Sequence, residues 1–411
     1  MRRIATFLIL LSFSLSIYPQ SLSTEKKEIL TSINSNLIDI ENSNPDYDFK
    51  ENAKLKSLFQ DVKIFGFGEA THGTKEFQDL KAKFFRYLVL NCNVKIFAIE
   101  ANYGDCLAIN SYVKEGKGNA KDALRGIGYW IWQTDELLSL IEWMKAYNTA
   151  KTEENKLSFI GIHVMNCQSS ATILQNHLQN NYSPANQKFL TVLNNYTSGV
   201  NSKKIRRKDF TEHYQILKSL ELELKSLKDN FLWQLNNSVL QYILMSIDYT
   251  QTLRDKLMSE NINWLIENNI GNVFISAHNI HVSKKNISFN PLGYYLKNKY
   301  SEKYCSVGFD FGSGNFNAFD IENNLIKKYS VDQPLNGSST QVFYKASSDI
   351  FLLDFRKSTL SPTLNEFVNS KSFRRGVGST FSPKMVETEK LAETFDAILF
   401  VKKSNETSLL K

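Results

Sequence analysis

The alternation of apolar and polar positions along the chain predicts a sheet whose strands are separated by helices. Five short apolar runs have the length and composition of buried strands: residues 62–67, 94–99, 157–161, 272–277 and 305–311. Between the first two, apolar residues recur every three or four positions and predict a helix from Thr74 to Leu90. A strand, a helix and a strand in such short succession form a β-α-β unit, whose strands are parallel. The pattern therefore predicts an α/β fold with a central, largely parallel sheet flanked by helices.

The segment from about residue 169 to residue 269 interrupts this alternation, because its pattern is almost wholly helical. One apolar stripe runs through Leu217, Leu220 and Leu224, and another runs through Val239 and Ile243. We interpret this segment as a large helical insertion or cap on one α/β domain of residues 21–411. Beyond it, the pattern predicts a helix at residues 292–300 and strand-like runs at 341–345, 350–354 and 397–401.

The first 20 residues have the pattern of a secretory signal peptide. Arg2 and Arg3 precede an apolar stretch from Ile4 to Ile17, which is short for a membrane span and is interrupted by serines. We therefore expect an exported protein, periplasmic or secreted in a bacterium, with no stable membrane association after the signal is cleaved. An uncleaved anchor helix is the alternative.

Composition and charge narrow the range of partners. Of the 411 residues, 42% are apolar and 22% are charged, as in an ordinary globular protein. The formal net charge of +7 is too mild an excess to indicate a nucleic-acid-binding face. The four cysteines are widely spaced and form no C-x-x-C pair, so disulfides and buried free thiols both stay open: Cys92, Cys106, Cys167 and Cys305.

Ionisable side chains directly follow four of the predicted strands, namely Glu69, Glu100, His163 and His278. In a parallel sheet the carboxyl ends of the strands share one edge, and ligands bind there. We therefore expect these four residues to meet in one cleft. His72 lies three residues after Glu69 on a Gly-rich turn, and this carboxylate–histidine pair is a candidate acid–base site.

Each of these residues also has a purely structural interpretation. Glu69 could cap the helix that follows it, because carboxylates are favoured near a helix N-terminus. His72 could be a core histidine bonded to a carbonyl group, Glu100 could be structural, and His163 could begin a loop. A dense aromatic cluster at Tyr129, Trp130, Trp132 and Trp143 is open in the same way: it either packs in the core or forms the wall of a pocket for an apolar substrate.

Missing motifs disfavour several enzyme classes. The sequence has no G-x-S-x-G elbow, no Walker loop and no H-E-x-x-H motif. The turn that begins at Gly66 resembles a dinucleotide fingerprint, but Glu69 inside it would repel a pyrophosphate. What is left is histidine–carboxylate chemistry, in which His72 deprotonates a water molecule and Glu69 or Glu100 holds its ring.

A metal site is an alternative use of the same histidines. His281 lies three residues beyond His278, and only one of the two faces the cleft if the chain stays extended. Together with His72 and a carboxylate they could hold a metal ion, although the spacing of these ligands is unspecific. A metal-dependent hydrolase on the same cleft is therefore one alternative. A non-catalytic exported protein that binds an envelope glycan or lipid is another.

Three segments of the chain resemble the erythromycin esterase family: GFGEATHGTKEF at 66–77, FAIEA at 97–101 and SAHNIHV at 276–282. The combination of G-E-x-T-H-G with a distant A-H-N-x-H is specific, and the resemblance covers roughly residues 40–405. It implies a hydrolase that opens the macrolactone ester of macrolide antibiotics, and hence antibiotic resistance, or a relative that cleaves another carboxylic ester or lactone. No cofactor and no metal are implied.

The resemblance also implies roles for individual residues. His72 is the general base for water and Glu69 is its acidic neighbour, while Glu100 and His278 place or stabilise the reacting groups. Lys81 takes the position of a basic residue on the first helix and could stabilise the developing oxyanion. The residues expected to contact the substrate are His281, His163, Trp132 and Glu76.

Two features depart from the family pattern. Position 163 is a histidine where the pattern has an acidic residue, and the predicted signal peptide differs from the antibiotic-inactivating members, which act inside the cell. Both leave open whether the substrate is a macrolide. The expected partner is thus a small-molecule ester or lactone, and the sequence does not determine the oligomeric state.

Overall fold

The computed structural model describes residues 24–411, apart from residues 182, 198–204, 269 and 358–359. The predicted signal peptide at residues 1–20 lies outside the described residues. Within them, no helix is long and apolar enough to cross a membrane.

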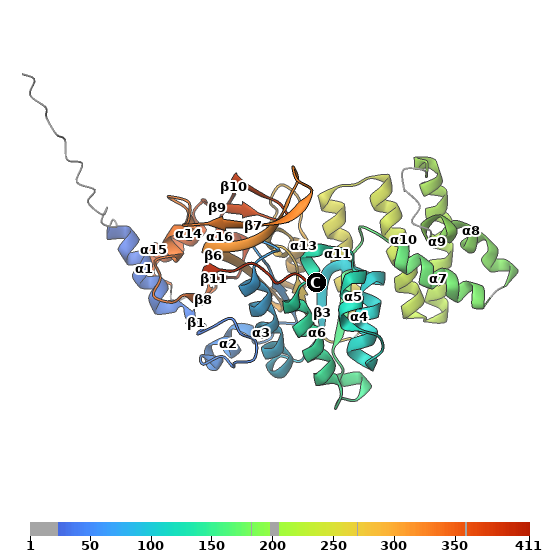
Figure 1. Ribbon diagram of the computed structural model, residues 1–411, viewed down its shortest axis with the longest axis horizontal. Helices are drawn as coiled ribbons and strands as arrows, with labels where there is room; N and C mark the ends of the chain where they lie inside the picture. Colours follow the sequence, from blue (N-terminus) through green and yellow to red (C-terminus); the bar gives the residue numbers. More distant parts are fainter. Residues whose placement is uncertain (1–23, 182, 198–204, 269, 358–359) are drawn as a thin grey trace, which may run out of the picture.

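The strands and helices alternate along most of the chain (Figure 1). The strands are β1 (Ile38–Asp39), β2 (Ile64–Phe67), β3 (Val94–Asn102), β4 (Ser158–His163), β5 (Asn272–Ser276), β6 (Tyr304–Asp320), β7 (Leu325–Val331), β8 (Ile350–Asp354), β9 (Ser372–Val377), β10 (Phe381–Glu389) and β11 (Ala397–Ser404). The α-helices are α1 (Thr24–Asn36), α2 (Asn52–Phe59), α3 (Lys75–Asn91), α4 (Tyr103–Glu115), α5 (Ala120–Gly126), α6 (Asp135–Asn148), α7 (Gln168–Asn180), α8 (Gln187–Thr197), α9 (Arg207–Leu227), α10 (Asn230–Ile247), α11 (Gln251–Glu267), α12 (Asn279–Val282), α13 (Leu292–Tyr300), α14 (Ser339–Phe343), α15 (Pro362–Asn369) and α16 (Leu391–Thr394).

A nine-stranded sheet forms the centre of the molecule, with the order β1-β8-β11-β6-β2-β5-β3-β4 and with β7 paired to β6. The six strands from β11 to β4 are parallel to their neighbours, whereas β8, β1 and β7 pair in the antiparallel sense. The expected α/β fold with a largely parallel sheet is confirmed. Because β2, β5, β3 and β4 are neighbours in this order, their carboxyl ends lie side by side at one edge of the sheet.

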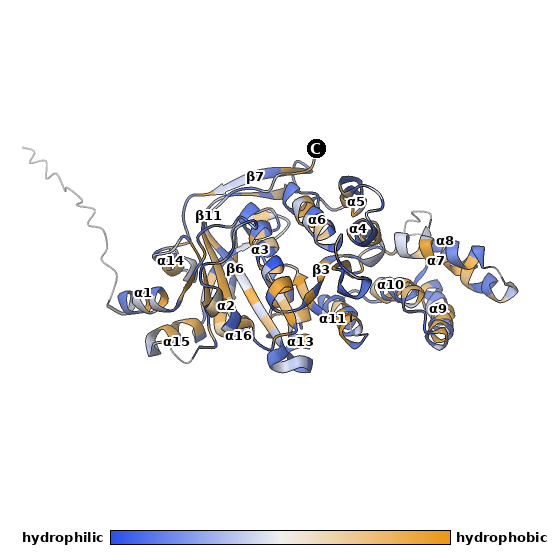
Figure 2. Cartoon of the chain, turned by 90° about the horizontal axis from the view of Figure 1, so that it is seen from below, coloured by the Kyte–Doolittle hydropathy of each residue, from blue (hydrophilic) through white to orange (hydrophobic). Residues whose placement is uncertain are grey.

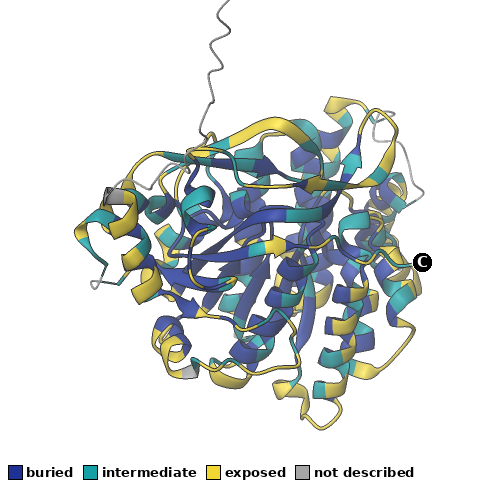
Figure 3. Cartoon of the chain, turned by 60° about the vertical axis from the view of Figure 1, so that its left-hand side comes forward, coloured by how far each residue is buried: buried dark blue, intermediate teal, exposed yellow. Residues whose placement is uncertain are grey.

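Helices cover both faces of the sheet, so the strands of its parallel part are largely buried on both sides (Figures 2 and 3). Phe65 of β2 and Phe274 of β5 belong to a core that also contains apolar residues of α3 and α6. The adjacent residues Ile64 and Val273 belong to a second core with α11 and α13. Successive residues of a strand point to opposite faces, which is why continuous apolar runs mark these strands in the sequence.

The helices expected between residues 169 and 269 are present as α7 to α11. Helices α7 to α10 have a separate apolar core, which includes Leu174, Leu193, Leu217 and Leu235. They extend from one end of the molecule, beyond the edge strand β4 (Figure 1). Helix α11 instead packs on the sheet, next to the carboxyl end of β4.

The tail of the chain departs from the sequence prediction at α14 and at the strands β7, β9 and β10. The expected strand at 341–345 is wrong: this stretch lies in and just after the helix α14, which begins where the Ser338 hydroxyl accepts a hydrogen bond from the Gln341 amide. A short apolar run cannot distinguish a strand from a short buried helix. The strands β9 and β10, which form a separate two-stranded sheet, were not predicted, because β10 carries mainly exposed and half-buried residues.

Candidate active site

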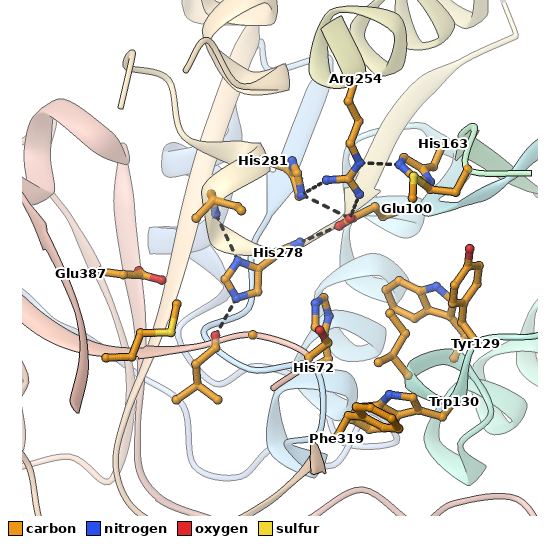
Figure 4. A pocket seen from close by; sticks show the side chains of 18 residues that line it. His72, Glu100, Tyr129, Trp130, His163, Arg254, His278, His281, Phe319 and Glu387 are labelled. Carbon is orange, nitrogen blue, oxygen red and sulfur yellow. Dashed lines mark hydrogen bonds and ion pairs between the residues drawn. The ribbon is translucent and has the colours of Figure 1, made fainter. Parts of the chain in front are cut away.

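A pocket of about 590 Å³ opens at the carboxyl edge of the sheet (Figure 4). Its volume lies within the range of small-molecule sites. It is lined by His72, Glu100, Tyr129, Trp130, Ile131, Trp132, His163, Met165, Arg254, His278, Ile280, His281, Phe319, Val377, Gly378, Ser379, Met385 and Glu387. The side chains predicted to meet from four separate strand ends therefore share one pocket, with the exception of Glu69, which lies directly behind His72.

Behind the pocket, a buried chain of polar contacts fixes the ring of His72. Its Nδ1 lies 2.5 Å from Oε1 of Glu69, which is fully buried. The other oxygen of Glu69 accepts hydrogen bonds from Lys81 Nζ at 2.5 Å and from Gln78 Nε2 at 3.3 Å. Lys81 also donates to the Ser276 hydroxyl at 3.1 Å. His72 Nδ1 is thus engaged, and none of the described residues forms a hydrogen bond with Nε2.

The charges in this chain determine how the His72 ring is protonated. Burial acts to raise the pKa of Glu69, but the nearby Lys81 ammonium and the bond to His72 outweigh burial and lower it. The ionised carboxylate can only accept, so it selects the tautomer of His72 that carries the proton on Nδ1. The lone pair of neutral His72 is then on Nε2. Burial lowers the pKa of Lys81, while Glu69 opposes this shift.

Glycines allow the turn that holds this pair to pack closely. A Cβ atom on Gly68 would lie 2.1 Å from Asn279 Oδ1, and one on Gly73 would lie 2.0 Å from the Asn317 carbonyl oxygen. Asn279 in turn bonds both the amide and the carbonyl group of Phe309. The turn after β2 is therefore fixed between the segment after β5 and the strand β6, which it could not approach with larger residues.

A second polar cluster, centred on Arg254 of α11, forms the opposite side of the pocket (Figure 4). Arg254 Nε donates to His163 Nε2 at 2.5 Å, and Nη2 donates to Glu100 Oε1 at 2.5 Å. His281 Nε2 lies 2.8 Å from Arg254 Nη1 and 3.2 Å from Glu100 Oε1, while its Nδ1 lies 2.8 Å from Asp255 Oδ1. The cluster joins side chains from β3, β4, α11 and α12 in one network.

Opposite charges compensate for burial in this cluster. Burial would raise the pKa of Glu100, but His281 and Arg254 hold it well below its ordinary value. Burial would lower the pKa of His281, but Glu100 and Asp255 raise it to about 9. Burial and the Arg254 charge lower the pKa of His163 well below its ordinary value, so His163 is a neutral acceptor. The ionised groups therefore pair as two anions with two cations.

His278 lies between these two clusters and has both ring nitrogens engaged. Its Nε2 lies 2.8 Å from the Val377 carbonyl oxygen, to which it donates, and its Nδ1 accepts from the Ile280 amide at 3.5 Å, which caps α12. Burial and the neighbouring His72 lower the pKa of His278 to about 4. The neutral ring therefore ties the end of β9 to the segment after β5, with its centroid 5.1 Å from that of His72.

Apolar side chains form the outer wall of the pocket. Tyr129, Trp130 and Trp132 come from the segment before α6, and Phe319 comes from the far end of β6 (Figure 4). Trp132 is buried and meets the ring of His72 edge-on, with centroids 6.1 Å apart. The predicted aromatic cluster thus contributes both to the core and to the pocket, whereas Trp143 packs on Phe85 and Arg86 away from it.

A known protein family matches most of this chain. The sequence model of the family described as erythromycin esterase matches residues 89–404, about three-quarters of the chain. The chain belongs to the erythromycin esterase family. Family membership identifies it as a hydrolase with a small-molecule substrate. The matched range begins after the turn that carries Glu69 and His72, so the roles of these two residues rest on their own geometry.

Known proteins similar to this chain share its fold at low sequence identity. Erythromycin esterase type II from Escherichia coli is 20% identical over 344 residues, which cover 72% of this chain and 81% of that protein. The crystal structure of a succinoglycan biosynthesis protein has a TM-score of 0.85 at 23% identity and covers 95% of this chain and 100% of its own. An erythromycin esterase mutant in its open conformation has a TM-score of 0.64 at 17% identity, covering 90% of this chain and 98% of its own. These structures show the fold.

In this member of the erythromycin esterase family, two of the predicted site residues besides Glu69 do not reach the pocket. Lys81 is 1% exposed and contacts Glu69 and Ser276, so it lies behind the His72 ring and not beside a bound substrate. Glu76 binds the amide and side chain of Asn405 at 2.7 Å and thereby anchors the C-terminal segment to α3. Neither side chain is among the described residues that line the pocket.

Sequence reasoning missed Arg254 and Asp255 as residues of the site. They belong to a long helix that carries no motif for a catalytic group. The one signal was that Arg254-Asp255, with Met258, Asn261 and Trp264, also resembles the erythromycin esterase family. The contributions of Val377 and Glu387 were also missed, because β9 and β10 were not predicted.

A group of three or more His, Cys, Asp or Glu side chains with the geometry of a metal site does not occur among the described residues. The histidines proposed as ligands are bonded elsewhere: His278 to Val377 and Ile280, and His281 to Asp255.

Proposed function

We propose that the chain hydrolyses a carboxylic ester or lactone with water activated by His72, without a covalent intermediate and without a metal. The observation that carries this proposal is the 2.5 Å contact between His72 Nδ1 and the ionised Glu69, which leaves Nε2 as the basic nitrogen in the pocket. A histidine base oriented by a carboxylate is a recurrent arrangement for activating a nucleophile.

In the proposed reaction, His72 Nε2 removes a proton from water as the water oxygen attacks the carbonyl carbon. The C=O electrons move to oxygen and form a tetrahedral oxyanion. When the intermediate collapses, the C–O bond to the alcohol breaks, and the His72 imidazolium returns its proton to the departing oxygen. The products are a carboxylic acid and an alcohol, which remain one molecule when the substrate is a lactone, and Glu69 stabilises the imidazolium throughout.

Arg254 is the pocket-lining cation that we assign to the oxyanion. Its guanidinium has five N–H groups, of which Nε donates to His163 and Nη2 donates to Glu100. Nη1 lies 2.8 Å from Nε2 of the protonated His281, which cannot accept a hydrogen bond. Three N–H groups are therefore left for a ligand. Because these contacts hold the guanidinium in place before the substrate binds, it does not have to reorient when the oxyanion forms in the transition state. This assignment replaces Lys81, whose ammonium group points to Glu69.

The mixed wall of the pocket supports a substrate with a large apolar body. Tyr129, Trp130 and Phe319 offer ring surfaces, while the two polar clusters lie deeper. A macrolide macrolactone has this character, and so do other bulky esters. We therefore propose a macrolide or a related lactone as the substrate, with antibiotic resistance as the consequence in the first case.

The test is to incubate the purified protein with erythromycin, a macrolide panel and a panel of bulky aryl and alkyl esters. Mass spectrometry reports the gain of one water by a lactone or the two products of an open-chain ester. Hydrolysis that persists after exhaustive chelation supports the metal-independent reaction. Activity that is lost on chelation and restored by one divalent metal contradicts it, and no hydrolysis across both panels contradicts the proposed reaction itself.

The variant His72→Ala is expected to lower kcat by about 10²- to 10⁴-fold, the usual contribution of a general base. Its fold should be kept, because His72 is at the surface of the pocket and Glu69 stays paired with Lys81. The matched control is His177→Ala, on an exposed position of α7. Rates equal to wild type in His72→Ala would refute the assignment.

We also propose that the protein is exported, on the basis of Arg2, Arg3 and the apolar stretch that follows them. Expression in a bacterium followed by cell fractionation and N-terminal sequencing tests this. Export predicts a mature chain that begins near residue 21 in the periplasm or medium, and a full-length chain kept in the cytoplasm would contradict it.

A further inference from the structure

A second cavity, of about 630 Å³, lies beside the active-site pocket and has no role in the reaction proposed above. It is formed by α12 and the loop that follows it, by β9 and β10, and by the segment around α16. Ile280, Met385 and Glu387 line both cavities, so these side chains form the partition between them.

Apolar side chains form part of the wall of this cavity, between polar and charged ones. Ile280, Ile287, Phe289, Met385 and Phe395 line it. Ile287 is 37% exposed and Met385 is 49% exposed, on two different segments that flank the cavity. Exposed apolar side chains that gather around a cavity of ligand size are typical of a binding site, since scattered ones would need no explanation.

The rim of the cavity is positively charged. Lys285 and Lys390 both pair with the single carboxylate of Glu393, and Lys371 makes no ion pair with a described residue. Deeper in the cavity, Arg374 is 2% exposed and pairs with both Glu387 and Glu389. The buried cation is therefore outnumbered by carboxylates, whereas the rim has more ammonium groups than carboxylates.

We propose that this cavity binds an amphipathic carboxylate, an aliphatic acid whose chain lies against the apolar wall and whose head group meets the lysines of the rim. The charges of the cavity determine the orientation of the bound acid, because Glu387 and Glu389 repel its carboxylate from the interior of the cavity. The flexible stems of the lysines can lie along the ligand chain while their ammonium groups reach its head group. A cationic or neutral amphiphile lacks this match.

Binding is tested by isothermal titration of the mature chain with octanoate, decanoate and dodecanoate, each below its critical micelle concentration. Each added methylene that enters the cavity should tighten binding by about fourfold, the factor that corresponds to ~0.8 kcal/mol per buried methylene. Decanol and decyltrimethylammonium should bind at least tenfold more weakly than decanoate. Equal affinity for the ammonium amphiphile, or no binding of any acid, would overturn the proposal.

Variants locate the bound acid. Ile287→Glu and Lys371→Glu change exposed side chains, so the fold should tolerate them, and each should weaken decanoate binding by tenfold or more. The matched control Lys208→Glu, an exposed lysine on α9, should leave the affinity unchanged.

The variant Trp130→Ala separates the two cavities, because Trp130 lines only the active-site pocket. Decanoate binding should survive this substitution. If Trp130→Ala abolishes binding while Ile287→Glu and Lys371→Glu do not, the acid occupies the active-site pocket and the proposal is wrong. The outcome is independent of whether the chain hydrolyses esters, since binding is measured directly.

Discussion

The pair formed by Glu69 and Lys81 is fully enclosed, and its two charges are separated by 2.5 Å. Taking two charges out of water is costly, and only their mutual attraction and further hydrogen bonds offset that cost. Here Gln78, His72 and Ser276 supply those bonds. At the scale of single residues, Lys81 is therefore connected to His72 only through Glu69, whose charge sets the tautomer of His72.

Removing one partner of this pair should be much more damaging than removing both. Lys81→Met leaves Glu69 buried and unpaired, and we expect a loss of about 3–5 kcal/mol in the free energy of unfolding. The double variant Glu69→Gln/Lys81→Met should recover part of that loss. Urea unfolding of the single and double variants measures both effects.

Lys75→Met serves as the control on the same helix, because Lys75 pairs with Asp79 at a partly exposed position and should contribute about 1 kcal/mol or less. If Lys81→Met lowered the free energy of unfolding no more than Lys75→Met, the loss of Lys81 would not leave a costly unpaired charge at Glu69.

Because of His281, the stability of the protein should decrease as the pH becomes alkaline. Its pKa in the folded state, about 9, lies above the ordinary value of 6.5, so the folded chain holds a proton that the unfolded chain releases between these values. The stabilisation is complete below pH 6.5 and is lost as the pH rises through 9. The difference of 2.5 pH units corresponds to about 3 kcal/mol.

The measurement compares the free energy of unfolding of wild type and His281→Gln between pH 6 and pH 9.5. The wild-type advantage should shrink as the pH rises, because the charge that Glu100 and Asp255 stabilise is lost. An advantage that stays constant, or grows, across this range would contradict the assignment of a protonated His281.

At the scale of elements, the turn after β2 is positioned by segments distant in sequence. Gly73 bridges to Asn317 of β6, and its carbonyl group accepts a hydrogen bond from the Thr407 amide. Glu76 and Asn405 continue this contact along α3. The C-terminal segment therefore packs against the turn and the helix that carry His72 and Lys81, and it holds them in register with the sheet.

Gly73→Ala should disturb this packing directly. The added methyl group would lie 2.0 Å from the Asn317 carbonyl oxygen, so the backbone must move, and we expect a loss of about 1–3 kcal/mol in the free energy of unfolding together with reduced activity. The control is Gly126→Ala in α5, where nothing lies within 4 Å of the new atom. There the substitution should stabilise the helix by up to about 1 kcal/mol, and chemical unfolding reports both variants.

At the scale of the whole molecule, stability comes from two apolar cores on opposite faces of one sheet and a third in the helical extension. All four cysteines are free, and three of them are buried: Cys106, Cys167 and Cys305. Burial raises the pKa of each of these thiols, which suppresses the reactive thiolate. The fold therefore depends on packing and not on cross-links.

A reducing agent should consequently leave the thermal unfolding midpoint unchanged. Thiol titration of the denatured protein, without prior reduction, should detect all four cysteines, whereas in the native protein Cys92 should react first because it is only half-buried. A midpoint that falls on reduction, or fewer than four thiols after denaturation, would reveal a disulfide and contradict this prediction.

The sequence by itself determined the α/β fold, the strands of its parallel sheet and the strand ends where ionisable residues meet. Local pattern was sufficient for this, because strands buried on both faces must be continuously apolar and because the carboxyl ends of parallel strands always share an edge. On these grounds Glu69, Glu100, His163 and His278 were predicted to meet in one cleft. Three of them line one pocket together with His72, whereas Glu69 lies behind His72 and the pattern had left the direction of His281 open.

Only the tertiary structure decided which charged groups reach the pocket. The direction of a helical side chain depends on how its helix packs, so Lys81 turned inward to Glu69 while Arg254, from a helix without any motif, entered the site. The strands β9 and β10 gave no apolar signal, because β10 is mainly exposed and β9 carries two arginines and a glycine, yet they line the active-site pocket and the cavity beside it. Contacts between residues this far apart in sequence depend on the packing of the whole chain, which no local pattern encodes.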